Sequence, residues 1–169
     1  LARLNDFVAE FNDGLAPGER LEPYAADDLR KLGFWMATGS GKTLLMHVNL
    51  LQYQHYLRRS SAPDGLNRVI LLTPNEGLSA QHLCDFDASG ILARLFQKDS
   101  GRLLDGDVVE VVDIHKLAEE MGEKTVAVEA FEGNNLVLVD EGHRGVAGED
   151  WAHKRDRLCA QGFSFEYSA

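Results

Sequence analysis

The chain has 169 residues, of which 44% are hydrophobic and 26% are charged, a composition typical of one soluble globular domain. No apolar run approaches the roughly 18 residues of a membrane span, so we expect a protein with no membrane partner. The net charge of −10 argues against nucleic-acid binding through a general positive field, because contact with phosphates depends on Lys and Arg. Any nucleic-acid role then requires a local patch or a further part of the protein.

Residues 1–31 are predicted to form a helical lead-in to the domain. Leu1, Leu4, Val8 and Phe11 lie three to four residues apart, which is typical of an amphipathic helix. Residues 12–23 are rich in Gly and Pro and indicate a loop, and a short helix is expected over 24–32. The chain begins with Leu rather than Met and has no signal-peptide pattern, so we expect a fragment of a longer cytoplasmic protein.

From residue 32 onward, strand and helix patterns alternate. Strands are expected at 32–36, 68–73, 108–113, 135–141 and 163–169. Helices are expected at 42–59, 76–89, 91–98, 114–123 and 149–162. In the first of these helices, Leu45, Val48, Leu51 and Tyr56 lie roughly on one side. This order predicts an α/β fold with a parallel sheet covered by helices on both faces. Ligands of such sheets bind beyond the carboxyl ends of the strands, so the residues after 36, 73, 113, 140 and 167 should line one rim.

The sequence "TGSGKT" follows the first strand and opens the long helix. Its residues are Thr38, Gly39, Ser40, Gly41, Lys42 and Thr43. The glycines allow backbone N–H groups to converge on a phosphate, and the helix N-terminus adds a partial positive charge. Lys42 is expected to reach the β- and γ-phosphates, and the Thr43 hydroxyl to bind Mg²⁺. The pattern G-x-x-x-x-G-K-[ST] has Met36 in place of its first glycine.

Two acids, Asp140 and Glu141, end the apolar strand "NLVLVDE". Beside bound phosphates, one carboxylate at such a position can hold Mg²⁺ and the next can orient and deprotonate the attacking water. We assign the metal to Asp140 and the base to Glu141. Alone, such a pair is often only a solvated strand end, but here it follows a buried strand in a chain with a phosphate loop.

Four segments occur in the order of a known family. "MATGSGKT", "LLTPNEGLSAQHL", "DEGH" and "FEYSA" resemble motifs I, Ia, II and the start of III of superfamily 2 DEAD/DEAH-box helicases and translocases. The likeness is strongest to the motor subunits of type III and type I restriction enzymes, in which Met-Ala-Thr-Gly also precedes the loop. The resemblance implies that residues 32–169 form the first RecA-like lobe of an ATP-dependent DNA motor. It implies a second lobe beyond the chain, which supplies an arginine to the shared ATP site.

The family's roles carry over residue by residue. The resemblance implies that Lys42, Thr43, Asp140 and Glu141 handle ATP and Mg²⁺. It implies that His143 couples the nucleotide site to Ser168 and Ala169. Contacts to one nucleic-acid strand are implied for Thr73, Pro74 and Asn75. The implied partners are double-stranded DNA and a nuclease or methyltransferase.

Other interpretations remain open at this point. His143 could be a surface histidine, and residues 73–75 could be plain turn chemistry. The basic stretch 153–157 could contact phosphate or form a solvated helix face. Two other functions, a P-loop phosphotransferase for a small molecule and a nucleotide-binding scaffold module, use the same loop. DNA dependence of the ATPase in the full-length protein separates these functions.

Overall fold

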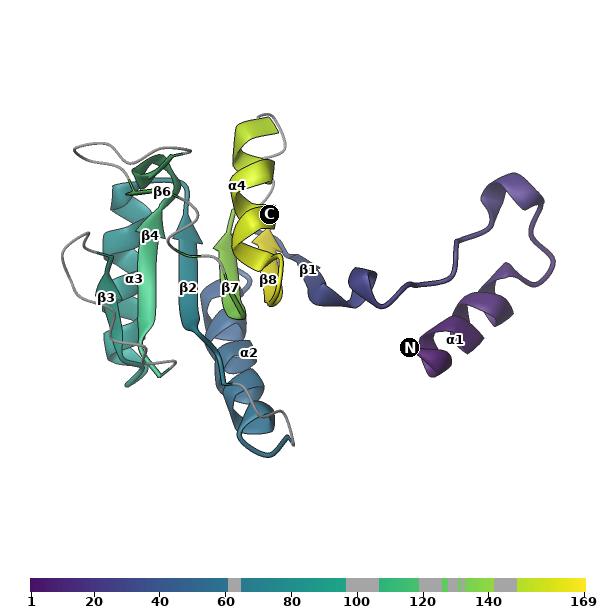
Figure 1. The fold of residues 1–169 in the computed structure, drawn as a ribbon, viewed down its shortest axis with the longest axis horizontal. Helices are drawn as coiled ribbons and strands as arrows, with labels where there is room; N and C mark the ends of the chain where they lie inside the picture. The colour runs from purple at the N-terminus through teal and green to yellow at the C-terminus, as the bar shows by residue number, and fades with distance from the viewer. Residues whose placement is uncertain (61–64, 97–106, 119–125, 128–130, 132, 142–148) are drawn as a thin grey trace.

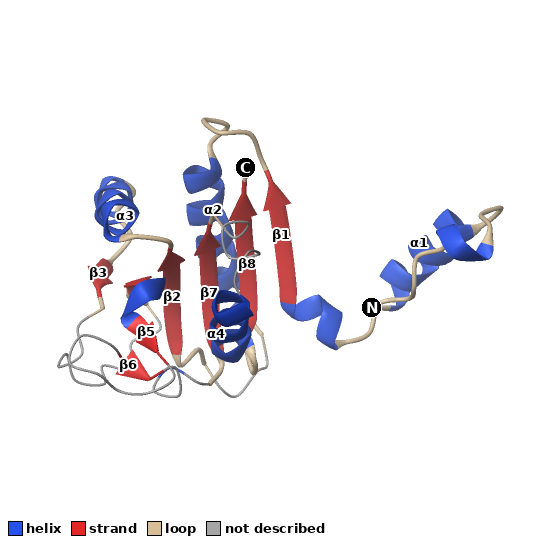
Figure 2. Ribbon diagram, turned by 90° about the horizontal axis from the view of Figure 1, so that it is seen from above, coloured by secondary structure: helices blue, strands red, loops and turns tan. Residues whose placement is uncertain are grey.

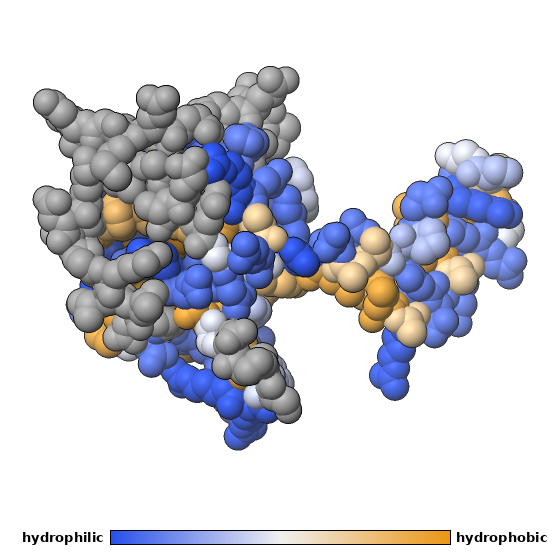
Figure 3. Space-filling model, in the orientation of Figure 1, coloured by the Kyte–Doolittle hydropathy of each residue, from blue (hydrophilic) through white to orange (hydrophobic). Residues whose placement is uncertain are grey.

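The structure is a computed structural model that describes residues 1–60, 65–96, 107–118, 126–127, 131, 133–141 and 149–169. Its N-terminal segment stands apart from the sheet (Figure 1). This segment contains the expected helix, α1 (Ala2–Asn12), and two 3₁₀ turns, η1 (Pro17–Glu19) and η2 (Asp27–Arg30). Val8 is the buried residue of α1, whereas Leu4, Phe7 and Phe11 are exposed. Apolar surface is therefore visible on this segment (Figure 3).

Six parallel strands form the main sheet, in the order β1-β8-β7-β2-β4-β3 (Figure 2). The strands are β1 (Lys31–Trp35), β2 (Arg68–Thr73), β3 (Ala93–Leu95), β4 (Val109–Asp113), β7 (Asn135–Asp140) and β8 (Phe163–Ser168). A separate pair of short strands is formed by β5 (Leu117–Ala118) and β6 (Val126–Ala127). The predicted α/β fold with a parallel sheet is confirmed.

Helices cover both faces of the sheet, and the strand residues alternate between two cores. The helices α2 (Lys42–Leu57) and α3 (Glu76–Ala88) pack on Val69 and Leu71 of β2 through Met46, Leu50 and Phe86. On the other face, Ile70 and Leu72 pack with Leu158 of α4 (Glu149–Cys159) and Ile114 of the 3₁₀ turn η3 (Ile114–Lys116). This period-two alternation explains why β2 reads as a continuous apolar run.

The strand ends meet at one edge of the sheet, as predicted. Trp35 pairs with Ser168, Asp140 pairs with Tyr167, and Thr73 pairs with Asp113 in the parallel register. Because every strand runs in the same direction, the residues that follow these ends share one rim, called the carboxyl rim below.

The helix predicted over 91–98 is wrong for the described part of that segment. Residues 93–95 form β3, which pairs with β4. Gly90, at φ +68°, ends the preceding helix, and Ile91 N–H then donates to the Phe86 carbonyl, so the chain turns back toward the sheet. Backbone bonds to β4 decide the conformation there, which a short local pattern cannot reveal.

Three further expectations need correction. The helix predicted over 114–123 is a 3₁₀ turn followed by β5, with residues 119–123 outside the described part. The short helix over 24–32 is η2 followed by β1. The stripe of Val48, Leu51 and Tyr56 on α2 is exposed. The face of α2 that the protein buries is instead formed by Met46, His47, Asn49 and Leu50.

Candidate functional site

The glycine loop connects β1 to α2 at the carboxyl rim. The Met36 N–H donates to the Ser168 carbonyl, so the loop leaves the sheet beside the end of β8. Gly39 and Gly41 have φ of +76° and +93°, and a Cβ at either would meet no atom within 4 Å. Their requirement for glycine is therefore the left-handed backbone, as the sequence predicts. Residues 38–41 are all exposed, and Gly41 is the N-cap of α2.

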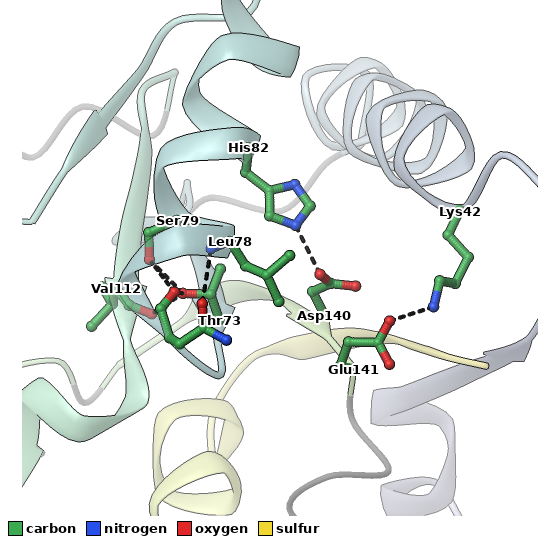
Figure 4. Close-up of polar contacts among 9 residues, drawn as sticks. Lys42, Thr73, Leu78, Ser79, His82, Val112, Asp140 and Glu141 are labelled. Carbon is green, nitrogen blue, oxygen red and sulfur yellow. Dashed lines mark hydrogen bonds and ion pairs between the residues drawn. The ribbon is translucent and has the colours of Figure 1, made fainter. Parts of the chain in front are cut away.

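Lys42, the first residue of α2, reaches across the rim to Glu141. Its Nζ lies 2.6 Å from Glu141 Oε1, and the two side chains are 12% and 18% exposed (Figure 4). This ion pair joins residues 99 positions apart in the chain. The structure thus brings the predicted phosphate lysine and the predicted base together, while Thr43 lies half-buried in the same first turn of α2.

Glu141 has a backbone conformation that is uncommon for a residue with a side chain. Its φ is +54°, and it is the one non-glycine residue with positive φ in the described part of the chain. Successive residues of a strand point to opposite faces, so this left-handed turn ends the alternation directly after Asp140. Strained backbone of this kind concentrates at functional sites, where surrounding contacts hold it.

Asp140 is the last residue of β7 and is held by a histidine of α3. His82 Nε2 lies 2.9 Å from Asp140 Oδ2, and both side chains are at least nine-tenths buried. A carboxylate only accepts hydrogen bonds, so Nε2 is the donor. Figure 4 shows Asp140 turned toward His82 and Glu141 turned toward Lys42, so the two acids serve different partners.

His82 lies within the segment that resembles motif Ia but received no role from the sequence. It shares the buried side of α3 with Ser79 and Phe86, at a spacing of three and four residues. A polar residue on the sheet-facing side of a helix is the signal that could have found it, because buried polar groups require partners.

The residues predicted to contact nucleic acid differ in exposure. Thr73 is fully buried, and its hydroxyl lies 2.6 Å from that of Ser79. Pro74 is half-buried and Asn75 is exposed. The Asn75 side chain accepts the Leu78 N–H at 3.0 Å and so caps α3. Of these three residues, Pro74 and Asn75 are the ones with surface to offer a ligand.

The predicted coupling residues are placed only in part. His143 lies outside the described residues. Ser168 ends β8 with its side chain largely buried, and Ala169 is exposed beside it. Since the Ser168 carbonyl accepts from Met36, the start of the glycine loop and the end of β8 are joined directly.

Two groups under the rim have shifted pKa values because they are buried. Burial raises the pKa of the Tyr167 phenol, although Asn49 Nδ2 donates to its oxygen at 2.8 Å. Burial lowers the pKa of His47, and nearby His82 lowers it further against an opposing effect of Asp85. Both groups therefore stay neutral near pH 7 and act as packing and hydrogen-bonding residues.

Fold and site together define an α/β lobe of the P-loop class, in which the lysine that follows the glycine loop contacts an acid just after a strand end. The chain belongs to the family of type III restriction enzyme res subunits, because the model of that family matches residues 3–163. This match confirms the resemblance stated from the motifs. No described helix is long and apolar enough to span a membrane.

Solved helicase structures show a limited similarity to the chain. The helicase nonstructural protein 10 of Arterivirus in complex with DNA has 16% identity and a TM-score of 0.45, over 82% of this chain and 28% of that chain. A crystal structure of the same Arterivirus helicase has 17% identity and a TM-score of 0.43, over 82% and 27%. The chain therefore spans less than a third of each helicase. A comparison with curated proteins finds no match.

Proposed function

We propose that the chain is the ATP-binding front lobe of an ATP-dependent DNA helicase or translocase of a restriction or phage-defence system. The observation that carries this proposal is the contact between Lys42 at the glycine loop and Glu141 at the end of β7. It joins the two halves of a phosphate-handling site that the sequence separates by 99 residues. Membership of the res-subunit family supports the motor class.

The glycine loop is suited to bind the phosphates of ATP. Residues 38–41 are exposed, Gly39 and Gly41 have left-handed backbone, and the loop leads into the N-terminus of a 16-residue helix. Backbone N–H groups and the helix dipole both favour an anion there. Lys42 adds a full positive charge, for which a phosphate would compete with Glu141.

Asp140 and Thr43 are suited to hold Mg²⁺ beside those phosphates. A carboxylate and a hydroxyl are hard oxygen donors, and Mg²⁺ in such sites takes one or two protein ligands together with phosphate oxygens. When bound, the metal neutralises charge on the transferred phosphoryl group.

Glu141 is proposed as the base that orients and deprotonates water. In its ion pair with Lys42, the carboxylate is already occupied by a cation. Once Lys42 turns to a phosphate, Glu141 can accept a proton from water at the same rim. Binding of a phosphate to Lys42 would thereby release the Glu141 carboxylate to act as the base.

Contact with DNA is proposed at the N-terminus of α3. Pro74 and Asn75 offer surface there, while Thr73 holds the turn from beneath through Ser79. His143, with Ser168 and Ala169, is proposed to couple this contact to ATP. A second RecA-like lobe and a nuclease or methyltransferase complete the proposed assembly.

The test is ATP hydrolysis by the full-length protein, with and without double-stranded DNA. We expect stimulation by DNA and loss of turnover in Glu141→Gln, with nucleotide binding retained. Glu10→Gln, in the exposed face of α1, is the control and should match the wild type. An ATP hydrolysis rate that DNA does not change would contradict the motor function and favour a phosphotransferase or scaffold module.

A further inference from the structure

We infer that His82 is a positioning residue for the metal-binding carboxylate of Asp140, and that it makes the geometry of that carboxylate depend on α3. This inference rests on the proposed function, since it assigns a role to the proposed metal ligand. His82 lies 58 residues before Asp140 in the chain and reaches it from a different element (Figure 4).

The contact distinguishes the two oxygens of the Asp140 carboxylate. Nε2 donates to Oδ2 at 2.9 Å, so Oδ1 is the oxygen that this bond leaves for a metal or a metal-bound water. The backbone of Asp140 is fixed by pairing with Tyr167 of β8. With the backbone held by the sheet and Oδ2 held by His82, the carboxylate has little freedom to rotate. Partners that orient ligands in this way commonly change metal affinity or activity 10- to 100-fold when removed.

The position of His82 is itself set by α3. Its ring packs near Phe86, with centroids 6.4 Å apart, and Nδ1 is buried with no hydrogen-bond partner among the described residues. Among the described residues, Nε2 is therefore the ring nitrogen of His82 that has a hydrogen-bond partner. The hydrogen bond that the His82 ring makes is therefore the one to the Asp140 carboxylate.

The same helix begins at the proposed DNA contact. Asn75 caps α3, and the hydroxyls of Thr73 and Ser79 hold its first turns to the end of β2. His82 lies seven residues after Asn75, which is about 10 Å along a helix. Because a helix moves as a rigid unit over this length, a shift of its N-terminus would also move the ring that holds Asp140.

His47 provides a matched comparison for a buried histidine that only packs. It lies on α2, stacks on the same Phe86 at 4.5 Å between centroids, and is as buried as His82. Its Nδ1 lies 2.8 Å from the Ser89 hydroxyl rather than from an acid. Substitution of His47 therefore disturbs the same core without touching Asp140.

The experiment measures the affinity of the 169-residue chain and of the full-length protein for a fluorescent ATP analogue, with and without Mg²⁺. The variants are His82→Gln, His82→Asn and His47→Asn. The amide nitrogen of Gln can take the place of Nε2, whereas Asn is too short to reach Asp140. We expect His82→Asn to raise the Mg²⁺ concentration of half-maximal effect by about tenfold or more. His82→Gln should restore most of this loss, and His47→Asn should leave the Mg²⁺ dependence unchanged.

Equal Mg²⁺ dependence in His82→Asn and the wild type would overturn the inference, as would an equal shift in His47→Asn. A wild-type affinity that ignores Mg²⁺ would overturn both this inference and the metal role of Asp140. The proposed motor function fails separately, when DNA does not stimulate hydrolysis in the full-length protein. A His82-specific shift in Mg²⁺ dependence would then still support the positioning role.

Discussion

At the scale of single residues, Lys42 pairs with Glu141 at the place where we propose that it binds a phosphate. Glu141 holds it at 2.6 Å in a largely buried ion pair. Breaking such a pair costs free energy, because each charge loses its partner while remaining partly out of water. In the proposed function, a triphosphate at the loop would offer more negative charge than one carboxylate, so the exchange would favour the phosphate and release Glu141. Before that exchange, the ion pair with Glu141 holds the Lys42 side chain along the carboxyl rim.

The first prediction concerns Lys42→Ala, which should abolish detectable nucleotide binding. A charged hydrogen bond contributes roughly 1.5–3 kcal/mol, and Lys42 would make more than one to the phosphates. Binding of a fluorescent ATP analogue to the 169-residue chain is the measurement. Lys31→Ala is the control, because Lys31 pairs with Asp156 and Glu166 instead. Affinity within threefold of the wild type in Lys42→Ala would contradict the phosphate role of this lysine.

At the scale of elements, the entry into β8 is packed against the start of β7. Gly162 follows α4, and a Cβ there would lie 2.0 Å from the Asn135 carbonyl oxygen and 2.6 Å from its nitrogen. Asn135 is buried, and its side-chain amide donates to the carbonyls of Phe131 and Leu158. The glycine thus lets two neighbouring strands start close together, one of which ends at the acids.

Gly162→Ala is predicted to destabilise the chain by about 1–3 kcal/mol or more, because the added carbon overlaps backbone that cannot shift without disturbing the sheet. Chemical denaturation of the 169-residue chain measures the free energy of unfolding. Gly18→Ala is the control, since a Cβ at Gly18 would have no atom within 4 Å. Equal stabilities for the two variants would show that the close approach at Gly162 relaxes without cost.

The strands that the sequence predicted well are those buried on both faces of the sheet. β2 and β7 lie inside the sheet with helices or turns on both faces, so their apolar runs have one reading. By contrast, β3 is a three-residue edge strand, and its pattern fits a helix equally well. The buried face of α2 was misjudged because His47 and Asn49 are polar. Their partners, Ser89 and Tyr167, are distant in the chain.

In the candidate site, residues within local motifs were predicted, and residues that depend on distant partners were missed. Lys42, Asp140 and Glu141 were predicted because each lies in a short motif whose chemistry is local, and the rim geometry follows from parallel strands. His82 was missed because its partner is 58 residues away. The burial of Thr73 was likewise hidden, since it depends on the packing of α3 over the end of β2.

At the scale of the whole molecule, the glycine loop of the candidate site lies at the surface. The glycine loop at residues 38–41 is exposed, and β1, the strand that precedes it, is at an edge of the sheet (Figure 2). The net charge of −10 gives the chain no general attraction for DNA. In a motor built on this lobe, another part of the protein would then supply much of the affinity for DNA. The proposed second lobe would also supply part of the ATP site.

The last prediction is that the 169-residue chain alone binds Mg-ATP weakly and hydrolyses it barely, if at all. In the motors that the motifs resemble, a second lobe supplies an arginine to the phosphates, and such arginines contribute about 10³–10⁵ in rate. The measurement is steady-state hydrolysis by the chain and by the full-length protein, each with and without double-stranded DNA. Glu141→Gln in both forms gives the background from contaminating ATPases. Robust DNA-stimulated hydrolysis by the 169-residue chain would contradict the prediction, because the residues of this chain would then suffice for catalysis.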